Sequence, residues 1–167
     1  VDLLLDALAL LGDDDWARID AVRVEGGGPL EPLVRERCAA LRAAGRPVHD
    51  GGFLDREAAA SALGWADRLL LPSRIESIPL IFSDAMHFNV PVVAMPVGDL
   101  PRLVEAAHGW KASAVDAPAL HLALSASLAP GPRADAALAD IASTFDVQAI
   151  ARAFARAALA SRNGEPP

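Results

Sequence analysis

The stretch that decides the fold reads ADRLLLPSRIESIPLIFSDAM over residues 66–86 and is followed by VPVVA over residues 90–94. Residues 68–71 have the pattern of a short buried strand that a proline ends. Pro79 can occupy the first position of a helix, where a missing N–H costs nothing, and Asn89 suits a left-handed cap at the helix end. The segment therefore predicts a strand, an exposed loop, a helix and a second strand.

The alternation of strands and helices extends along the rest of the chain. Apolar residues at helical spacing indicate helices, and alternating apolar residues indicate strands. Glycines, prolines and acidic runs mark the boundaries between them. We expect strands over residues 19–24, 46–50, 68–71 and 90–95, and helices over residues 1–11, 30–41, 55–63, 79–88, 101–107, 117–128, 134–143 and 147–161. This order predicts the α/β class, with a doubly wound parallel sheet in a three-layer α/β/α domain, because parallel neighbours need a crossover connection. We place the domain in residues 1–162, with a frayed tail over residues 163–167.

Length, charge and cysteine content exclude several classes of protein. At 167 residues the chain has the size of one domain. Its formal net charge of −7 and its scattered basic residues provide no electrostatic footprint for DNA or RNA, so we expect no nucleic-acid partner. The single cysteine, Cys38, falls on an apolar helical stripe and is expected in the core, and no Cys/His group has zinc spacing. Because the sequence shows no signal peptide and no apolar run long enough to cross a bilayer, we expect a cytoplasmic location.

Ligands of doubly wound sheets bind beyond the carboxyl ends of the strands. The loops at those ends, which we expect together on one edge, cover residues 26–29, 51–54, 72–78 and 96–101. A helix begins near Pro79, and its first turn has unpaired N–H groups and the positive end of the helix dipole. Both features favour the binding of a diphosphate at this position. Glu76 and Asp84 flank that position, so the two carboxylates can accept hydrogen bonds from hydroxyls on either side of a diphosphate, such as those of a ribose and a sugar.

These motifs resemble the C-terminal, donor-binding domain of GT-B glycosyltransferases of family 4, the retaining group 1 enzymes. Residues 66–101 are similar to that family's pattern of Ala-Asp, Pro-Ser, a carboxylate, seven residues, a second carboxylate, Ala-Met and a Pro-Val strand. Residues 24–29 look like its glycine-proline loop after a strand, and residues 52–54 look like its loop near the nucleotide base. Downstream, residues 97–101 are similar to its Gly-Gly-x-Pro-Glu turn, and residues 145–158 to its C-terminal helix.

The resemblance implies a Rossmann-like domain that binds a nucleotide-diphosphate sugar, with a UDP-sugar or GDP-sugar as the donor and no metal or other cofactor. Glu76 would accept hydrogen bonds from the donor sugar and is the implied catalytic residue, whereas Asp84 would hold the ribose. Backbone N–H groups of residues 77–81 would hold the sugar and the diphosphate. The implied donor-binding residues are Gly27, Gly28, Pro29, Phe53, Leu54, Arg74, Glu76, Ser77, Ile78, Pro79, Leu80, Ile81 and Asp84.

Several positions depart from the family's pattern. Asp84 stands where the family has a glutamate, Ser77 and Asp99 stand where it has glycines, and Arg102 stands where it has a glutamate. In the family's pattern, three features lie before the position that corresponds to Val1: the first strand, the basic residues that bind the diphosphate, and the acceptor domain. We therefore expect a fragment of a two-domain enzyme that does not catalyse transfer by itself.

The partners implied by the resemblance are a nucleotide sugar, the protein's own N-terminal acceptor domain, and a glycan, lipid-linked or small-molecule acceptor. Peripheral attachment to the inner face of a membrane would come from the missing half. Two alternatives stay open: the corresponding half of a GT-B sugar-nucleotide epimerase, and a non-catalytic binding or assembly module with a degenerate site.

Some of these residues also have ordinary structural interpretations. Residues 26–29 can form only a tight turn, and Arg74 can be a solvated loop arginine rather than a phosphate ligand. His87 is expected to be a surface or capping residue, and the three tryptophans are expected to pack separately.

Overall fold

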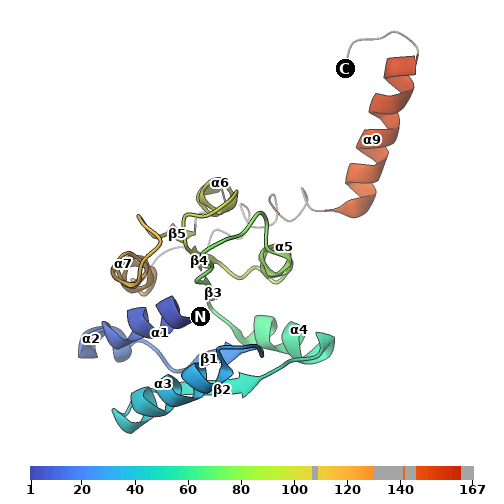
Figure 1. The fold of residues 1–167 in the computed structure, drawn as a ribbon. Coiled ribbons are helices and arrows are strands. Elements are labelled where there is room, and N and C mark those ends of the chain that lie inside the picture. The colour runs from blue at the N-terminus through green and yellow to red at the C-terminus, as the bar shows by residue number, and fades with distance from the viewer. Residues whose placement is uncertain (107–108, 130–140, 142–145, 163–167) are drawn as a thin grey trace.

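The computed structural model describes residues 1–106, 109–129, 141 and 146–162. Helices and strands alternate along the chain from β1 to α7 (Figure 1). The strands are β1 (Val22–Glu25), β2 (Val48–Gly52), β3 (Leu69–Leu71), β4 (Val92–Ala94) and β5 (Trp110–Lys111). The helices are α1 (Asp2–Ala9), α2 (Asp13–Trp16), α3 (Glu31–Ala43), α4 (Arg56–Trp65), α5 (Leu80–His87), α6 (Leu100–Ala106), α7 (Ala117–Ser127) and α9 (Val147–Arg162).

All strand pairs are parallel, and they form two sheets rather than one. The first sheet contains β1 and β2, with Val22 opposite Val48. The second contains β3, β4 and β5 in that order, with Leu70 opposite Val93 and Ala94 opposite Lys111. The predicted α/β class with parallel strands is confirmed. Among the described residues the strands fall into two sheets, because β1 and β3 are not hydrogen-bonded to each other.

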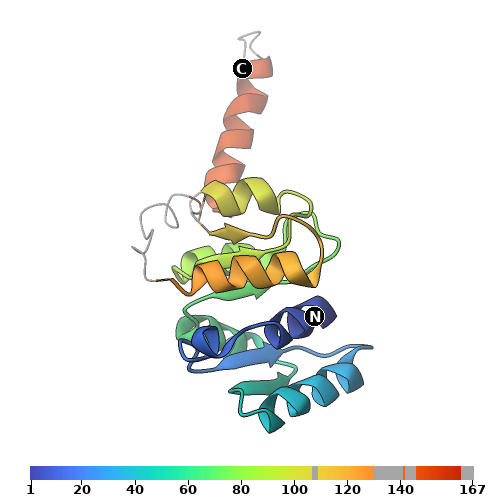
Figure 2. The ribbon, with the colours of Figure 1, turned by 90° about the vertical axis from the view of Figure 1, so that its left-hand side faces the viewer.

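The buried side chains form two clusters on opposite sides of β4. Val93 belongs to the cluster that contains the leucines of α1 together with Val24 and Cys38. Val92 and Ala94 belong to the cluster that contains Phe82 of α5 and side chains of α6. Since successive side chains of a strand point to opposite faces, β4 is covered by helices on both faces. The three-layer arrangement is visible in Figure 2, where α7 lies in front of the second sheet.

Helix ends follow local chemistry, with some differences from expectation. Asp55 is the N-cap of α4, since its side chain accepts a hydrogen bond from the Ala58 N–H at 2.8 Å. Asn89 has the predicted left-handed conformation, with φ of 54°. Pro79 is the N-cap of α5 rather than its first helical residue. The acidic run after Gly12 does not simply end the first helix: it forms α2, because carboxylates are stabilised at a helix N-terminus.

Two further boundaries differ from the sequence expectation. Strand β2 runs through Gly51 and Gly52, which were expected to break it; Gly52 adopts φ of 78° where the register of β1 and β2 shifts. Strand β5 was not predicted at all. The helix expected over residues 134–143 and the tail expected over residues 163–167 fall outside the described residues, apart from Ile141. Among the described residues, no helix is both long and apolar enough to cross a membrane.

Candidate functional site at the carboxyl ends of the strands

A cavity of about 380 Å³ lies where β1 and β2 end. It opens between the glycine loop that follows β1 and the last residues of β2. The residues around it are Val1, Val24, Glu25, Gly26, Gly27, Gly28, Pro29, Leu30, Glu31, Val34, Arg35, Asp50, Gly51 and Gly52. The predicted site residues Gly27, Gly28 and Pro29 therefore line a cavity.

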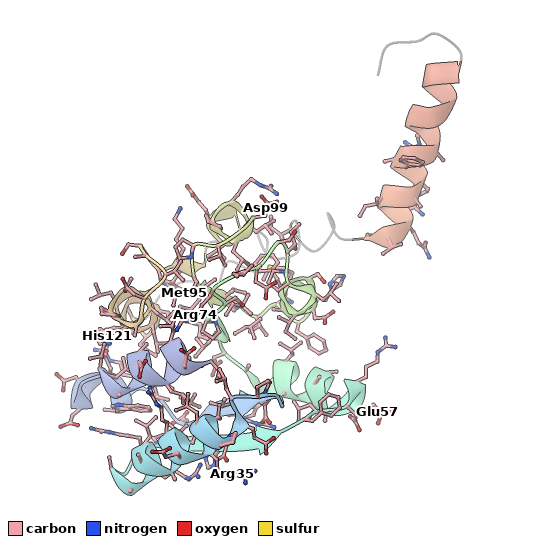
Figure 3. All side chains as sticks on the ribbon, in the orientation of Figure 1. Arg35, Glu57, Arg74, Met95, Asp99 and His121 are labelled. Atoms are coloured by element: carbon pink, nitrogen blue, oxygen red, sulfur yellow. The ribbon has the colours of Figure 1, made fainter. Side chains whose placement is uncertain are left out.

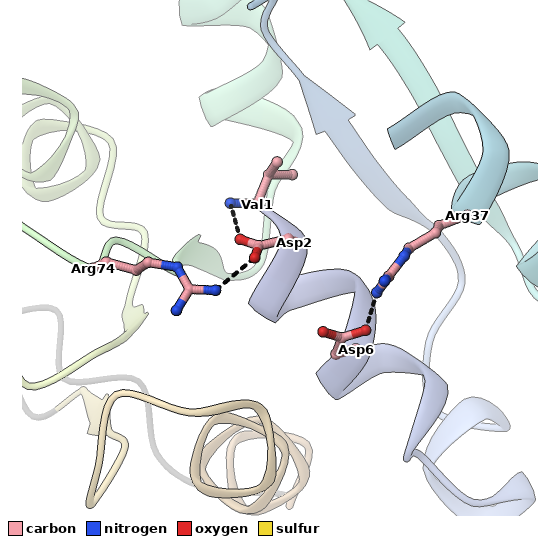
Figure 4. Close-up of polar contacts among 5 residues, drawn as sticks. All are labelled: Val1, Asp2, Asp6, Arg37 and Arg74. Carbon is pink, nitrogen blue, oxygen red and sulfur yellow. Dashed lines mark hydrogen bonds and ion pairs between the residues drawn. The ribbon is translucent and has the colours of Figure 1, made fainter. Parts of the chain in front are cut away.

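The beginning of α1 connects this cavity to the loop after β3. Val1 lines the cavity, and the next residue, Asp2, accepts a hydrogen bond from Nη2 of Arg74 at 2.5 Å (Figure 4). That hydrogen bond lowers the pKa of the Asp2 carboxyl below its ordinary value. The Arg74 guanidinium, labelled in Figure 3, thus forms an ion pair with α1 and remains 54% exposed.

The loop after β3 holds Glu76 half-buried. The Ser73 hydroxyl donates a hydrogen bond to Oε1 of Glu76 at 3.1 Å. The loop after β4 supports the next peptide, since the Asp99 N–H donates to the Ser77 carbonyl at 3.1 Å. Gly98 adopts φ of 54°, and a Cβ there would lie 2.2 Å from the Glu76 carbonyl oxygen. The two loops therefore pack backbone against backbone, and this contact fixes the position of Glu76.

Helix α5 begins directly after this loop. The Leu80 and Ile81 N–H groups lie in its first turn, where a helix has no intrahelical acceptors for them. The Phe82 N–H already donates to the Pro79 carbonyl at 3.0 Å. Asp84 lies one turn further on and is exposed. An anion at the start of α5 would have Glu76 before it in the chain and Asp84 after it.

Several large apolar side chains on these loops and on the adjoining helix starts are exposed. Phe53 and Leu80, both predicted site residues, are each 85% exposed, and Ile75 is 90% exposed. Ile78 and Leu30 are also among the exposed large apolar residues. Apolar groups gathered at one edge are typical of a surface that contacts a ligand or another domain.

Glu25 is a residue of this edge that sequence reasoning missed. Its Oε1 accepts a hydrogen bond from Nε of Arg23 at 2.7 Å, and its buried Oε2 has no hydrogen-bond partner among the described residues. The carboxylate lies over Gly51, where a Cβ would be 1.9 Å from Oε2. The available signal was a charged residue at the end of an alternating strand, directly before a glycine loop.

The remaining side chains that the sequence singled out have structural contacts. Cys38 is fully buried in the first cluster, as predicted, and burial raises the pKa of its thiol. Nδ1 of His87 lies 2.7 Å from the Ser83 carbonyl oxygen one turn earlier. Trp16 is buried, whereas Trp65 is half exposed and stacks under the Arg23 guanidinium. Within the described ranges, no group of three His, Cys, Asp or Glu side chains is placed to hold a metal ion.

Comparison with known proteins identifies the family. A family model described as glycosyl transferases group 1 matches residues 1–129. The chain therefore belongs to the group 1 glycosyltransferase family. A search of curated proteins finds no match.

Solved structures show the same fold. The chain superposes on HepE from Anabaena, solved in complex with UDP, with a TM-score of 0.70 and 19% identity over 95% of this chain and 44% of that chain. It superposes on WaaG, a glycosyltransferase involved in lipopolysaccharide biosynthesis, with a TM-score of 0.66 and 19% identity over 87% of this chain and 39% of that chain. The chain thus spans less than half the length of either structure, and its fold corresponds to one half of a GT-B glycosyltransferase.

Proposed function

We propose that this chain is the nucleotide-sugar-binding half of a retaining glycosyltransferase, and that the donor binds at the carboxyl ends of its strands. The observation that carries the proposal is the pair of loops around Glu76. They hold a half-buried carboxylate directly before the unpaired N–H groups of α5, on the same edge as the glycine-loop cavity. The match of the group 1 family over residues 1–129 supports this assignment.

Each group has a chemical role in the proposal. The Leu80 and Ile81 N–H groups and the helix dipole hold the diphosphate and stabilise the negative charge that develops on it when the sugar leaves. Glu76 accepts hydrogen bonds from hydroxyls of the donor sugar and so orients its anomeric carbon. Asp84 accepts hydrogen bonds from the ribose. Phe53 and Leu54, next to the cavity, contact the base.

The UDP in the HepE structure supports a UDP-sugar as the donor class, with a GDP-sugar as the second candidate. The acceptor site belongs to the other half of the protein in this proposal, because the chain spans less than half the length of the GT-B structures that it matches. The acceptor is a glycan, a lipid-linked sugar or a small molecule. We place the transfer reaction in the cytoplasm, at the inner face of a membrane if the acceptor is lipid-linked.

The proposal is tested by calorimetric titration of UDP, GDP, ADP and dTDP into the complete polypeptide. We expect saturable binding of one nucleotide. Asp84→Ala should weaken it about tenfold or more, the size expected for a lost hydrogen bond to a charged group. Glu36→Ala, which removes an exposed carboxylate from α3, serves as the matched control and should leave the affinity unchanged.

Glu76→Gln should leave nucleotide affinity within about twofold and lower the rate of sugar transfer at least about 100-fold, a loss of about 2.7 kcal/mol. Product formation without an acceptor would instead indicate an epimerase. No binding of any of the four nucleotides would contradict the proposal and favour an assembly module.

A further inference from the structure

The loop between β3 and α5 carries Glu76 but has little support from its own backbone. Among the described parts of the chain, residues 73–76 take part in no hydrogen bond between two backbone groups. The Ser77 carbonyl, one residue further on, accepts from the Asp99 N–H at 3.1 Å. A segment without backbone hydrogen bonds opens easily unless other contacts hold it. The position of Glu76 therefore depends on side chains of the loop.

Two side chains supply contacts to residues 73–76. The Ser73 hydroxyl donates to Glu76 within the loop, so this bond shapes the loop without attaching it to another element. Nη2 of Arg74 donates to Oδ2 of Asp2 at 2.5 Å, and this ion pair attaches the loop to α1. Arg74 and Glu76 are two residues apart in the chain, so a shift of one displaces the other.

Helix α1 is a firm anchor for this ion pair. Its buried side chains belong to the first core cluster, and it packs against α3 and α7. Asp2 is the first residue of the helix, where the helix dipole stabilises a carboxylate. The hydrogen bond from Arg74 lowers the pKa of Asp2, so this carboxylate is ionised at neutral pH.

A second aspartate of α1 forms a comparable ion pair away from the loop. One turn after Asp2, Asp6 pairs with Arg37 of α3 (Figure 4). Both aspartates lie on the same helix, and each binds an arginine of another element. Only the first of these two pairs joins α1 to the loop that carries Glu76, so the second provides a matched comparison.

We propose that Asp2 and Arg74 are positioning residues for the transfer of the sugar. Their ion pair holds the loop after β3 against α1 and so keeps the Glu76 carboxylate in place for the hydroxyls of the donor sugar. An error of about 1 Å in the placement of a reacting group can lower a rate about 100-fold. The inference rests on the proposed function, in which Glu76 contacts the donor sugar.

This role differs from that of a diphosphate ligand, and kinetics separates the two. Loss of a diphosphate ligand weakens binding of the nucleotide, because the ligand contacts the nucleotide before the sugar leaves. Loss of a contact that positions Glu76 lowers kcat and leaves nucleotide affinity unchanged, because Glu76 contacts the sugar and not the nucleotide. A positioning role also requires that Asp2 matter as much as Arg74.

The test uses the complete polypeptide and measures release of nucleoside diphosphate from UDP-glucose, UDP-N-acetylglucosamine and GDP-mannose, with calorimetric titration of UDP and GDP. We expect Asp2→Ala and Arg74→Ala each to lower kcat at least about tenfold, with KM and nucleotide affinity within about twofold of the unsubstituted protein. The double variant should lose no more than either single variant, because both substitutions remove the same ion pair. Asp6→Ala is the matched control and should leave kcat unchanged.

Two results would overturn this inference alone. One is weaker nucleotide binding in Arg74→Ala but not in Asp2→Ala, which would make Arg74 a diphosphate ligand. The other is the same kcat in Asp2→Ala as in Asp6→Ala, while Glu76→Gln is impaired. Failure of the unsubstituted protein to release nucleotide from any of these donors would overturn the proposed function and this inference together.

Discussion

At the scale of single residues, Gly98 is the most sensitive probe of the contact that positions Glu76. We predict that Gly98→Ala lowers the free energy of unfolding by at least about 1–2 kcal/mol, the cost of a left-handed conformation for a residue with a Cβ. Its Cβ would also displace the Glu76 and Ser77 carbonyls, so nucleotide affinity should fall about tenfold. Urea unfolding and calorimetry measure the two effects.

Gly12→Ala is the matched control for this substitution. Gly12 has φ of −77° and no atom within 4 Å of the position that a Cβ would take. The two variants should therefore differ in both stability and nucleotide affinity. If Gly98→Ala bound nucleotide as tightly as Gly12→Ala, the loop contact would not position the donor site.

The ion pair of Asp2 with Arg74 predicts a dependence on pH. The pKa of Asp2 is lower in the folded protein than its ordinary value of 3.8, so its contribution is present above that value and is lost as the pH falls through the folded pKa. Asp2→Asn should cost about 0.2–1 kcal/mol at pH 7, because the pair is partly exposed. Urea unfolding at pH 7 and pH 2 checks this, and an equal loss at both values would contradict it.

The spacing of residues in the sequence identified Glu76, Asp84 and the glycine loop as candidate site residues. It did not identify the contacts that surround them in the fold. The pairing of Asp2 with Arg74 joins residues far apart in the chain, so no local pattern predicts it. The same holds for Gly98 against Glu76 and for Glu25 over Gly51, which depend on how separate loops pack.

At the scale of elements, α4 offers a test of local stability. Asp55→Ala removes the side-chain hydrogen bond to the Ala58 N–H and should lower the free energy of unfolding by about 1 kcal/mol. Asp55→Asn keeps a hydrogen-bond acceptor at the cap and should lower the free energy of unfolding by only a few tenths of a kcal/mol. Thermal unfolding of both variants checks the difference, and equal losses would show that the cap contributes nothing.

Most elements were predictable because their apolar residues recur with a clear period, as in α1 and α3. The exceptions are short. Strand β5 has two residues and exists through pairing with β4, which its own sequence does not encode. Strand β2 tolerates Gly51 and Gly52 because β1 supplies hydrogen bonds along it, including that from the Gly26 N–H to the Gly52 carbonyl at 2.6 Å.

At the scale of the whole molecule, the sequence order predicted parallel strands but not their division into two sheets, since periodicity does not reveal which strands are neighbours.

The central claim is that the edge formed by the loops after β1, β2, β3 and β4 binds a nucleotide sugar. The most direct measurement is the calorimetric titration of UDP and GDP into the complete polypeptide and its Asp84→Ala variant. The account predicts saturable binding of one nucleotide and about a tenfold or greater loss in the variant. Absence of binding by both nucleotides, or equal affinity in the variant, would contradict it.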